Sequence, residues 1–328
     1  AMRKLATVRR IEEVKPIQGA DLIQAYRVDG WWLVDKKDAY QVGDLAIYCE
    51  LDSWIPNELA PFLSKGKQPR VFNGVAGERL RTIRLKGQLS QGLLLPVPES
   101  FVKVEGMHCT DALGITKWEP EVPAQLAGNI KGLFPPEIPK TDQERIQNIN
   151  LEEYMDDIYE VTEKLHGSSC TFYLDCEGTF HVCSRNWDLK RDENNAYWNA
   201  AIMNEVEERM REKSLYGFAL QGELCGAGIN GNNYKLGLKF FVFDIFVAAE
   251  GYMRPPYRHA LVQSLGLEHV PFACLGASIS GWTKEDLIKD ADGMSYLAEC
   301  KREGFVYKAY NSEKSFKVIS NDWLLKYD

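Results

Sequence analysis

Thr162-Glu163-Lys164-Leu165-His166-Gly167-Ser168-Ser169 decides the fold and follows an apolar, strand-like run that ends at Val161. A lysine after a strand is usually a solvated surface amine. Glycine three residues later changes the interpretation, because a residue without a Cβ lets the backbone pass close to a ligand. Lys-x-x-Gly alone is a weak signal, so the rest of the chain has to support it.

Five short motifs follow in order between residues 160 and 320. They are Ser184-Arg185-Asn186, Gln221-Gly222-Glu223-Leu224, Phe240-Phe241-Val242-Phe243-Asp244, Glu303-Gly304-Phe305-Val306-Tyr307-Lys308 and Ser315-Phe316-Lys317-Val318. In this order they resemble the motifs of covalent nucleotidyltransferases, most closely those of ATP-dependent RNA ligases, whose nucleophile motif is Lys-x-His-Gly. Matches in register over this length make the resemblance specific.

The resemblance assigns Lys164 as the nucleophile that attacks ATP and becomes lysyl-AMP. A free lysine has a pKa of about 10.4, so the site must favour the neutral amine, and both burial and a nearby divalent cation do so. By the same resemblance, Gly167 lies at the nucleotide and Glu163 contacts the adenine amino group. His166 is expected to support later steps that involve nucleic acid.

Two glutamates are candidate metal ligands. Glu223 and Glu303 lie at strand ends, where glutamate is a disfavoured residue, and this suggests a task for each. Carboxylates suit hard cations, so Mg²⁺ or Mn²⁺ is the expected cofactor, with ATP as substrate. The resemblance implies that Glu223 contacts the ribose and the metal shell, and that Glu303 orients metal-bound water beside the lysine.

Adenine requires an aromatic face. Strand alternation places Phe241 and Phe243 on one face, and Phe240, Val242 and Asp244 on the other. Core packing is the usual role of a phenylalanine in such a strand. The resemblance nevertheless makes Phe243 the stacking residue, with Phe241 as second choice.

Phosphate charge requires fixed cations. Lys317 resembles the lysine of the last motif, which contacts the α-phosphate. Family members often carry a second lysine two positions away, but this chain has Ser315 and Ile319 there, so Lys314 or Lys308 is left for that role. Arg185 matches the family arginine that contacts the ribose and the 5′-phosphate strand; the alternative is a surface ion pair with Asp188.

Length and pattern predict an α+β protein of two domains. The chain has 328 residues, of which 45% are hydrophobic. Residues 1–115 are expected to form an OB-like, nucleic-acid-binding β-barrel, residues 116–140 a Pro-rich linker, and residues 141–328 the nucleotidyltransferase domain (ATP-grasp-like, ligase type), with antiparallel sheets flanked by helices. Strand patterns in the barrel run over 5–11, 25–28, 31–34, 45–49, 79–85 and 92–96, with a helix over 59–64. In the second domain, helices are expected over 195–213 and after Thr283.

Charge bears on the partner. The net charge of −8 argues against nucleic acid, yet residues 64–88 carry seven basic residues and one acid, Glu78. A solvated charged face is the alternative. We assign Arg79, Arg81, Arg84 and Lys86 to phosphate contacts. A barrel ahead of the catalytic core resembles the RNA ligases that repair nicked duplexes with RNA on the 3′-OH side, which makes such a duplex the expected partner.

Other classes are disfavoured. Eight scattered cysteines without a Cys-x-x-Cys pair argue against structural zinc. No apolar run approaches the ~20 residues of a membrane helix, so we expect no membrane partner and a cytoplasmic, nuclear or organellar protein that is not secreted. The size is compatible with a monomer. Gly226-Ala227-Gly228-Ile229-Asn230-Gly231 matches G-x-G-x-x-G, but a strand pattern rather than a helix follows it, so a dinucleotide site is not expected.

Two alternatives to an ATP-dependent RNA ligase stay open at this stage. A GTP-dependent guanylyltransferase of the capping type would share Lys164 and the metal acids, and labelled ATP and GTP would separate the two. A non-catalytic RNA-binding module on the same scaffold predicts no covalent AMP, and no change on Lys164→Ala.

Overall fold

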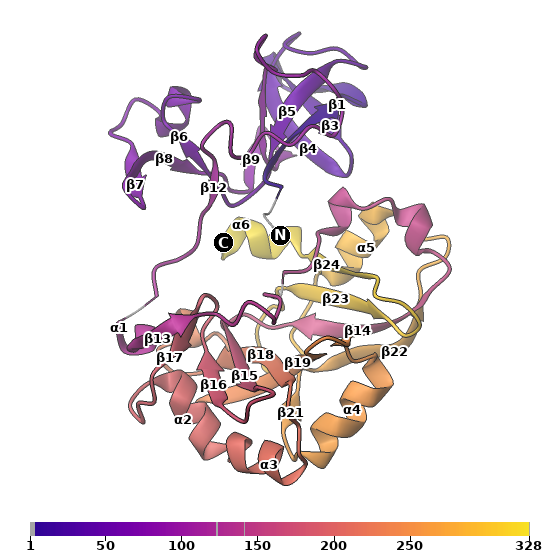
Figure 1. Ribbon diagram of the computed structural model, residues 1–328. Helices are drawn as coiled ribbons and strands as arrows, with labels where there is room; N and C mark the ends of the chain where they lie inside the picture. The colour runs from indigo at the N-terminus through magenta and orange to yellow at the C-terminus, as the bar shows by residue number, and fades with distance from the viewer. Residues whose placement is uncertain (1–3, 123, 141, 328) are drawn as a thin grey trace. The chain divides into compact units, whose positions relative to one another are not determined.

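The computed structural model describes residues 4–122, 124–140 and 142–327. The chain divides into two compact units, one running to Glu121 and including Leu324 onward, the other covering Val122–Trp323 (Figure 1). The segment 116–140, predicted as a linker, carries paired strands near both ends: β12 (Thr116–Lys117) pairs with β6, and β13 (Ile130–Leu133) pairs with β17. Backbone pairing therefore ties residues 116–117 to the first unit and residues 130–133 to the second.

The first unit consists of short antiparallel strands. Its sheets have the strand orders β1-β5-β11, β2-β3-β4, β12-β6-β8-β7 and β10-β9. The strands are β1 (Ala6–Arg10), β2 (Glu13–Ile17), β3 (Ala20–Val28), β4 (Trp31–Lys36), β5 (Leu45–Cys49), β6 (Ser53–Pro56), β7 (Arg70–Phe72), β8 (Val75–Arg79), β9 (Ile83–Leu85), β10 (Gln88–Ser90) and β11 (Leu93–Leu95). The predicted strand over 79–85 is in fact divided between β8 and β9, and the predicted helix is a 3₁₀ turn, η1 (Pro61–Ser64).

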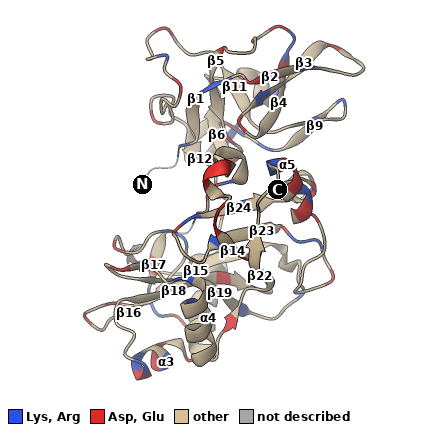
Figure 2. Cartoon of the chain, turned by 90° about the vertical axis from the view of Figure 1, so that its right-hand side faces the viewer, with Lys and Arg blue, Asp and Glu red and all other residues tan. Residues whose placement is uncertain are grey.

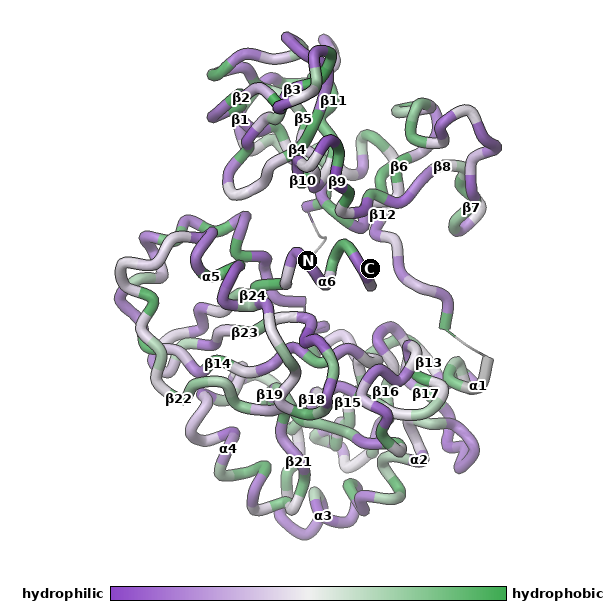
Figure 3. Tube along the Cα trace, turned by 180° about the vertical axis from the view of Figure 1, so that it is seen from behind, coloured by the Kyte–Doolittle hydropathy of each residue, from purple (hydrophilic) through white to green (hydrophobic). Residues whose placement is uncertain are grey.

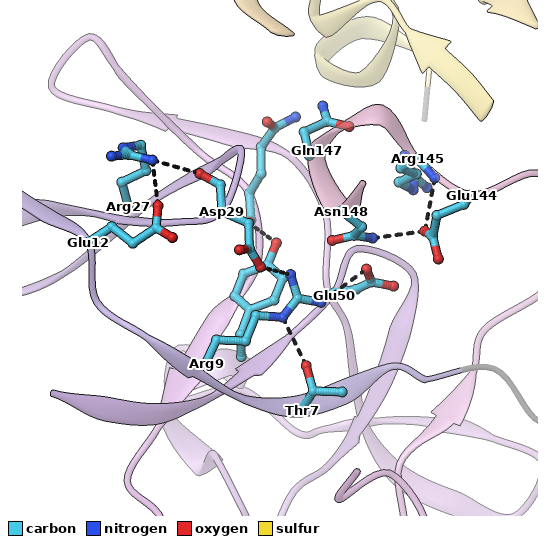
Figure 4. Close-up of polar contacts among 12 residues, drawn as sticks. Thr7, Arg9, Glu12, Arg27, Asp29, Glu50, Glu144, Arg145, Gln147 and Asn148 are labelled. Atoms are coloured by element: carbon cyan, nitrogen blue, oxygen red, sulfur yellow. Dashed lines mark hydrogen bonds and ion pairs between the residues drawn. The ribbon is translucent and has the colours of Figure 1, made fainter. Parts of the chain in front are cut away.

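Ion pairs brace the first unit. Arg9 on β1 donates to Asp29 at 3.0 Å and to Thr7 at 2.8 Å, and its guanidinium lies 3.5 Å from the buried Glu50 (Figure 4). Arg27 on β3 pairs with Glu12 at 2.6 Å. These arginines cross-link neighbouring strands, and their charges are used within the unit.

The second unit contains two sheets. The larger has the order β13-β17-β16-β15-β18-β19-β20, with β21 pairing parallel to β19, and the smaller has the order β22-β14-β23-β24. The further strands are β14 (Ile158–Lys164), β15 (Ser168–Leu174), β16 (Phe180–Cys183), β17 (Trp187–Leu189), β18 (Phe218–Cys225), β19 (Lys239–Val247), β20 (Gly251–Tyr252), β21 (Glu268–His269), β22 (Phe272–Ser278), β23 (Gly304–Ala309) and β24 (Ser315–Ile319). Apart from the two parallel β19–β21 partners, the named ladders are antiparallel, as predicted.

Helices cover the outer faces of both sheets (Figure 1). α2 (Ala196–Met203), α3 (Val206–Glu212) and α4 (Pro255–Ser264) pack on the large sheet, and α5 (Lys284–Ala291) packs on the small one. α1 (Ala124–Ala127) and α6 (Asn321–Lys326) complete the named α-helices, and three 3₁₀ turns also belong to this unit: η2 (Ile146–Asn148), η3 (Leu151–Tyr154) and η4 (Asn230–Asn232). Hydrophobic and hydrophilic residues alternate along α4 (Figure 3), as expected for a helix with one buried face.

Two helix predictions had different outcomes. The single helix expected over 195–213 is two helices, because Glu205 adopts φ 50° between α2 and α3. The helix after Thr283 is confirmed, with a capping box in which Thr283 and Asp286 bind each other's backbone N–H. α3 contains both acidic and basic residues (Figure 2). Within the described residues, no helix is long and apolar enough to cross a bilayer.

Candidate active site

The nucleophile loop, Leu165–Gly167, carries the chain from the small sheet to the large one. Lys164 is the last residue of β14, opposite Gly304 on β23, and Ser168 begins β15. This register places Glu303, which precedes β23, beside the lysine. The Nζ atom of Lys164 lies 3.1 Å from Oε2 of Glu303, and 30% of the lysine side chain is exposed. The amine is thus held by a carboxylate, at the end of a side chain that is partly exposed.

The second carboxylate comes from the large sheet. Glu223 on β18 lies opposite Ser169 on β15, and the backbone N–H of Gly167 donates to it. A Cβ at position 167 would lie 2.3 Å from the carbonyl oxygen of Leu224 and 3.1 Å from Cγ of Glu223. The close neighbour that requires glycine is therefore β18 of the protein itself, whereas the sequence interpretation gave this role to a ligand.

The charges of the site are coupled. Burial lowers the pKa of Lys164, but Glu303 and Glu223 outweigh burial, and the net pKa is raised. The pKa of Glu223 is raised to about 7, because burial and, to a smaller extent, Glu303 raise it more than Lys164 and Arg185 lower it. By itself the site therefore holds a charged lysine, and it becomes nucleophilic only when the two carboxylates are engaged elsewhere.

Glu223 and Glu303 fit a divalent cation. They are hard oxygen donors from two different sheets, and their mutual repulsion, visible in the raised pKa of Glu223, is what a bound cation would relieve. The structure thus brings the two predicted metal ligands together around Lys164.

Another group of possible ligands does not form a metal site. Ligand atoms of Glu160, His259 and His269 lie within 4.8 Å of one another. The fully buried Arg258 donates to both oxygens of Glu160 at 3.0 Å and contacts Nε2 of His269 at 2.7 Å. The guanidinium occupies these atoms and repels a cation. Burial and the charge of Arg258 lower the pKa of His269 to about 3, so the histidine is neutral.

Lys317 lies on the same face of the small sheet as Lys164. It pairs with Val306, which in turn pairs with Thr162, two residues before the nucleophile. Its Nζ donates to Asp142 at 3.1 Å, and it is nearly buried. Its contact with the α-phosphate remains a prediction, for which the placement is suitable.

Arg145 is a residue that the motif search missed. The backbone of Arg145 forms an isolated parallel β-bridge with Lys317. Arg145 is 5% exposed, and its positive charge lowers the pKa of Lys164. The segment before β14 was recognised only as the start of the domain. A basic residue in that segment was the available signal, but only the pairing with β24 brings it to the site.

The two lysines considered for the second phosphate role have different positions. Lys314 pairs with Asp157 at 3.3 Å, next to the start of β14 and therefore at the opposite end of that strand from Lys164. Lys308 lies 3.1 Å from Asp244 and donates to the carbonyl of Phe243. Between the two, Lys308 is the one that faces the large sheet.

Phe240, Phe241 and Phe243 on β19 point to two different cores. Phe240 and Val242 enter the core beneath the helices, whereas Phe241 and Phe243 lie in the cluster that contains Leu165, as alternation predicted. Phe241 is 2% exposed and packs in this core, while Phe243 is only partly buried. Phe243 is therefore better placed for stacking.

Asp244 departs from the predicted face. The register shift between Gln221 and Gly222 moves Asp244 to the side of Lys308, and Ile245 replaces it in the core. The prediction that Asp244 shares a face with Phe240 and Val242 is wrong, because a bulge breaks the two-residue period.

Glu163 has partners that its sequence position did not reveal. Alternation turns its side chain away from Lys164, and it is 1% exposed. Its two oxygens accept from Ser295 Oγ and from the Tyr296 N–H, both at 2.7 Å. These bonds connect β14 to the segment ahead of Glu303. Contact with adenine remains a prediction.

His166 and Arg185 are the remaining predicted residues of this site. The backbone N–H of His166 donates to the hydroxyl of Tyr234 at 2.8 Å, and its ring lies 5.1 Å from the ring of Trp323. Arg185 follows β16, and its charge lowers the pKa of Glu223. Asp188, the alternative ion-pair partner considered for Arg185, accepts a hydrogen bond from His181 at 2.7 Å.

The basic residues of the first unit differ in availability. Arg79 pairs with Asp52 at 2.7 Å, stacks 3.7 Å from the centre of the Trp118 ring, and is only 14% exposed. Its charge serves the fold, whereas the sequence interpretation assigned it to nucleic acid. Arg81, Arg84 and Lys86, on and beside the β9–β10 hairpin, are exposed.

A lysine at the end of a strand, two acids from separate antiparallel sheets and a second lysine on the same face of the small sheet define a covalent nucleotidyltransferase. Comparisons with known proteins specify the class. A family model described as RNA ligase matches residues 157–319, and an OB-fold domain model matches residues 5–97. A comparison with curated proteins found no match.

Solved structures of a Naegleria gruberi RNA ligase are similar over nearly the whole chain. An apo mutant has a TM-score of 0.92 and 43% identity, covering 98% of this chain and 97% of that one. Structures with pyrophosphate and, for a mutant, with AMP and manganese have the same TM-score and identity, covering 98% of both chains. This chain therefore belongs to the RNA ligase family. The predicted N-terminal OB fold and the assignment as an ATP-dependent RNA ligase are confirmed.

Proposed function

We propose that this enzyme seals nicks by joining a 3′-OH to a 5′-phosphate, with RNA on the 3′-OH side. The amine of Lys164 attacks the α-phosphorus of ATP; a P–N bond forms, a P–O bond breaks and pyrophosphate leaves. The 5′-phosphate then takes AMP from the lysine. Finally the 3′-OH displaces AMP, and a phosphodiester remains. The observation that carries the proposal is the ion pair of Lys164 with Glu303, with Glu223 close by on the other sheet.

The residues of the site perform separate tasks. Glu303 holds the amine in place, and Lys317 and Arg145 add positive charge on the face that would receive the triphosphate. Phe243 offers a partly open aromatic surface, with the Lys308 amine 5.4 Å from its ring centre. These groups bind the nucleotide, orient the amine and stabilise negative charge.

Mg²⁺ or Mn²⁺ is the proposed cofactor, held by Glu223 and Glu303. The ion would supply positive charge that engages the two carboxylates and favours the neutral amine. Support comes from the matched Naegleria gruberi structures, solved with ATP and Mn or with AMP and Mn.

The β9–β10 hairpin is the proposed phosphate-binding surface for the nicked duplex. Arg81, Arg84 and Lys86 are exposed on and beside this hairpin, whereas only 14% of the Arg79 side chain is exposed. We further propose that the enzyme acts as a monomer in the cytoplasm, nucleus or an organelle.

Two measurements test the function. Intact protein mixed with ATP and Mg²⁺ or Mn²⁺ should gain one adenylate, Lys164→Ala should gain none, and Lys190→Ala, at an exposed lysine, should behave as wild type. Sealing is then measured on nicks whose last two 3′-OH-side sugars are ribose or deoxyribose. Wild-type protein without the adduct would refute the mechanism, and equal sealing of both nicks would refute the RNA preference.

A further inference from the structure

The backbone of the nucleophile loop is bound by one contiguous segment of the chain. The His166 N–H donates to Tyr234, and the His166 carbonyl accepts from the Cys225 thiol at 3.9 Å. The Gly167 N–H donates to Glu223, and the Gly167 carbonyl accepts from Nδ2 of Asn230 at 2.5 Å. All four polar backbone groups of these two residues therefore contact side chains from residues 223–234, which we call the clamp segment.

The clamp segment is shaped by its own sequence. Gly226, Gly228 and Gly231 have φ of 140°, 80° and 79°, and Asn230 and Asn232 also adopt positive φ. Glycine and asparagine tolerate this region best, which explains why the G-x-G-x-x-G pattern occurs here without a dinucleotide site. The Asn232 side chain closes the bend by bonding both the N–H and the carbonyl of Leu236.

Two anchors fix this bend. Ile229 is 1% exposed and enters the core beneath the large sheet. Tyr234 is 3% exposed and packs with Leu165 and Phe241. Asn230, next to the first anchor, and the hydroxyl of Tyr234, on the second, are thereby held against the nucleophile loop.

We propose that Asn230 and Tyr234 are positioning residues for the adenylylation step. They hold the loop so that Lys164 stands at a set distance from Glu223, and this inference rests on the proposed function of Lys164. If Gly167 moves, its N–H leaves Glu223 and the lysine moves with the loop. A displacement of about 1 Å at a reacting centre costs about 100-fold in rate.

Near-isosteric variants test each bond. Asn230→Asp keeps the shape but presents oxygen to the Gly167 carbonyl, and Tyr234→Phe removes the acceptor of the His166 N–H. Asn194→Asp and Tyr257→Phe make the same changes at exposed positions of the same unit. Single-turnover formation of lysyl-AMP is measured by quenched flow at saturating ATP, and thermal unfolding verifies that each variant is folded.

We expect Asn230→Asp and Tyr234→Phe to form lysyl-AMP about 10-fold to 100-fold more slowly, with less change in the ATP concentration needed for half-saturation. Sealing of a pre-adenylylated nick without ATP should fall less, because Lys164 does not attack in that step. Unchanged lysyl-AMP formation in both variants would overturn the proposal, as would an equal loss in both steps. Wild-type protein that forms no lysyl-AMP would instead refute the proposed function.

Discussion

Replacing Glu223 by glutamine should stabilise the protein while it abolishes adenylylation. Burial, reinforced by Glu303, raises the pKa of this carboxyl to about 7, from 4.5 in a free glutamate. Folding therefore favours the protonated form. The contribution of the protonated Glu223 to the free energy of unfolding is fully present below pH 4.5. It is lost as the pH rises through about 7, because the buried carboxyl is then ionised.

The magnitude follows from this shift. The difference between the two pKa values, which already includes the attraction between Glu223 and Lys164, corresponds to at most about 3 kcal/mol at pH 8. We expect Glu223→Gln to raise the free energy of unfolding at pH 8 by about 1 to 2 kcal/mol. At pH about 4.5, where the wild-type carboxyl is protonated, the difference should approach zero.

Urea unfolding followed by tryptophan fluorescence measures this, at both pH values and with a chelator present so that no cation binds the carboxylates. Glu208→Gln, at an exposed position of α3, is the matched control and should show no such pH dependence. A variant that is no more stable than wild type at pH 8, or that differs equally at both pH values, would contradict the reasoning.

Three further predictions concern other parts of the molecule. Gly167→Ala places a Cβ 2.3 Å from the Leu224 carbonyl oxygen, so we expect the free energy of unfolding to fall by about 1 to 3 kcal/mol and lysyl-AMP to form about 100-fold more slowly. Gly276→Ala, with nothing within 4 Å of its Cβ, is the control and should be neutral. A Gly167→Ala rate within a few-fold of wild type would exclude the steric argument. The hydrogen bond to Asp188, together with that to Asp175, raises the pKa of His181 above 6.5. The ionic contribution of His181 to the free energy of unfolding, which His181→Asn removes, should therefore be largest below pH 6.5 and should vanish as the pH rises through the pKa of the folded state. A loss that is independent of pH in urea titrations would argue against this contribution. Replacing Arg81, Arg84 and Lys86 by glutamate should raise the Kd for a nicked duplex and reduce its salt dependence by up to about three charges. The control variant replaces the exposed Lys4, Lys37 and Lys103 by glutamate. Equal effects of the two triple variants would exclude the hairpin from the interface.

The one-dimensional pattern was sufficient where a residue's task depends on its neighbours in the chain. The start of α5 after Thr283 and the opposite faces of Phe240 and Phe241 on β19 could be predicted because both signals are local. Motif order also predicted Lys164, Glu223 and Glu303 as site residues, and the structure brings these three together. Their chemistry demands these residue types, and the spacing of the motifs places each at a strand end.

Only the tertiary structure decided how the side chains of the remaining candidates are oriented and what they contact. Glu163 is adjacent to Lys164, but its side chain points away from Lys164 and binds Ser295 and Tyr296. Phe241 is buried in the hydrophobic core. A bulge on β19 moved Asp244 to the face of Lys308. Arg145 and the clamp segment reach the site through pairing between distant parts of the chain. Such pairing depends on register and bulges, which residue identity along a single strand does not encode.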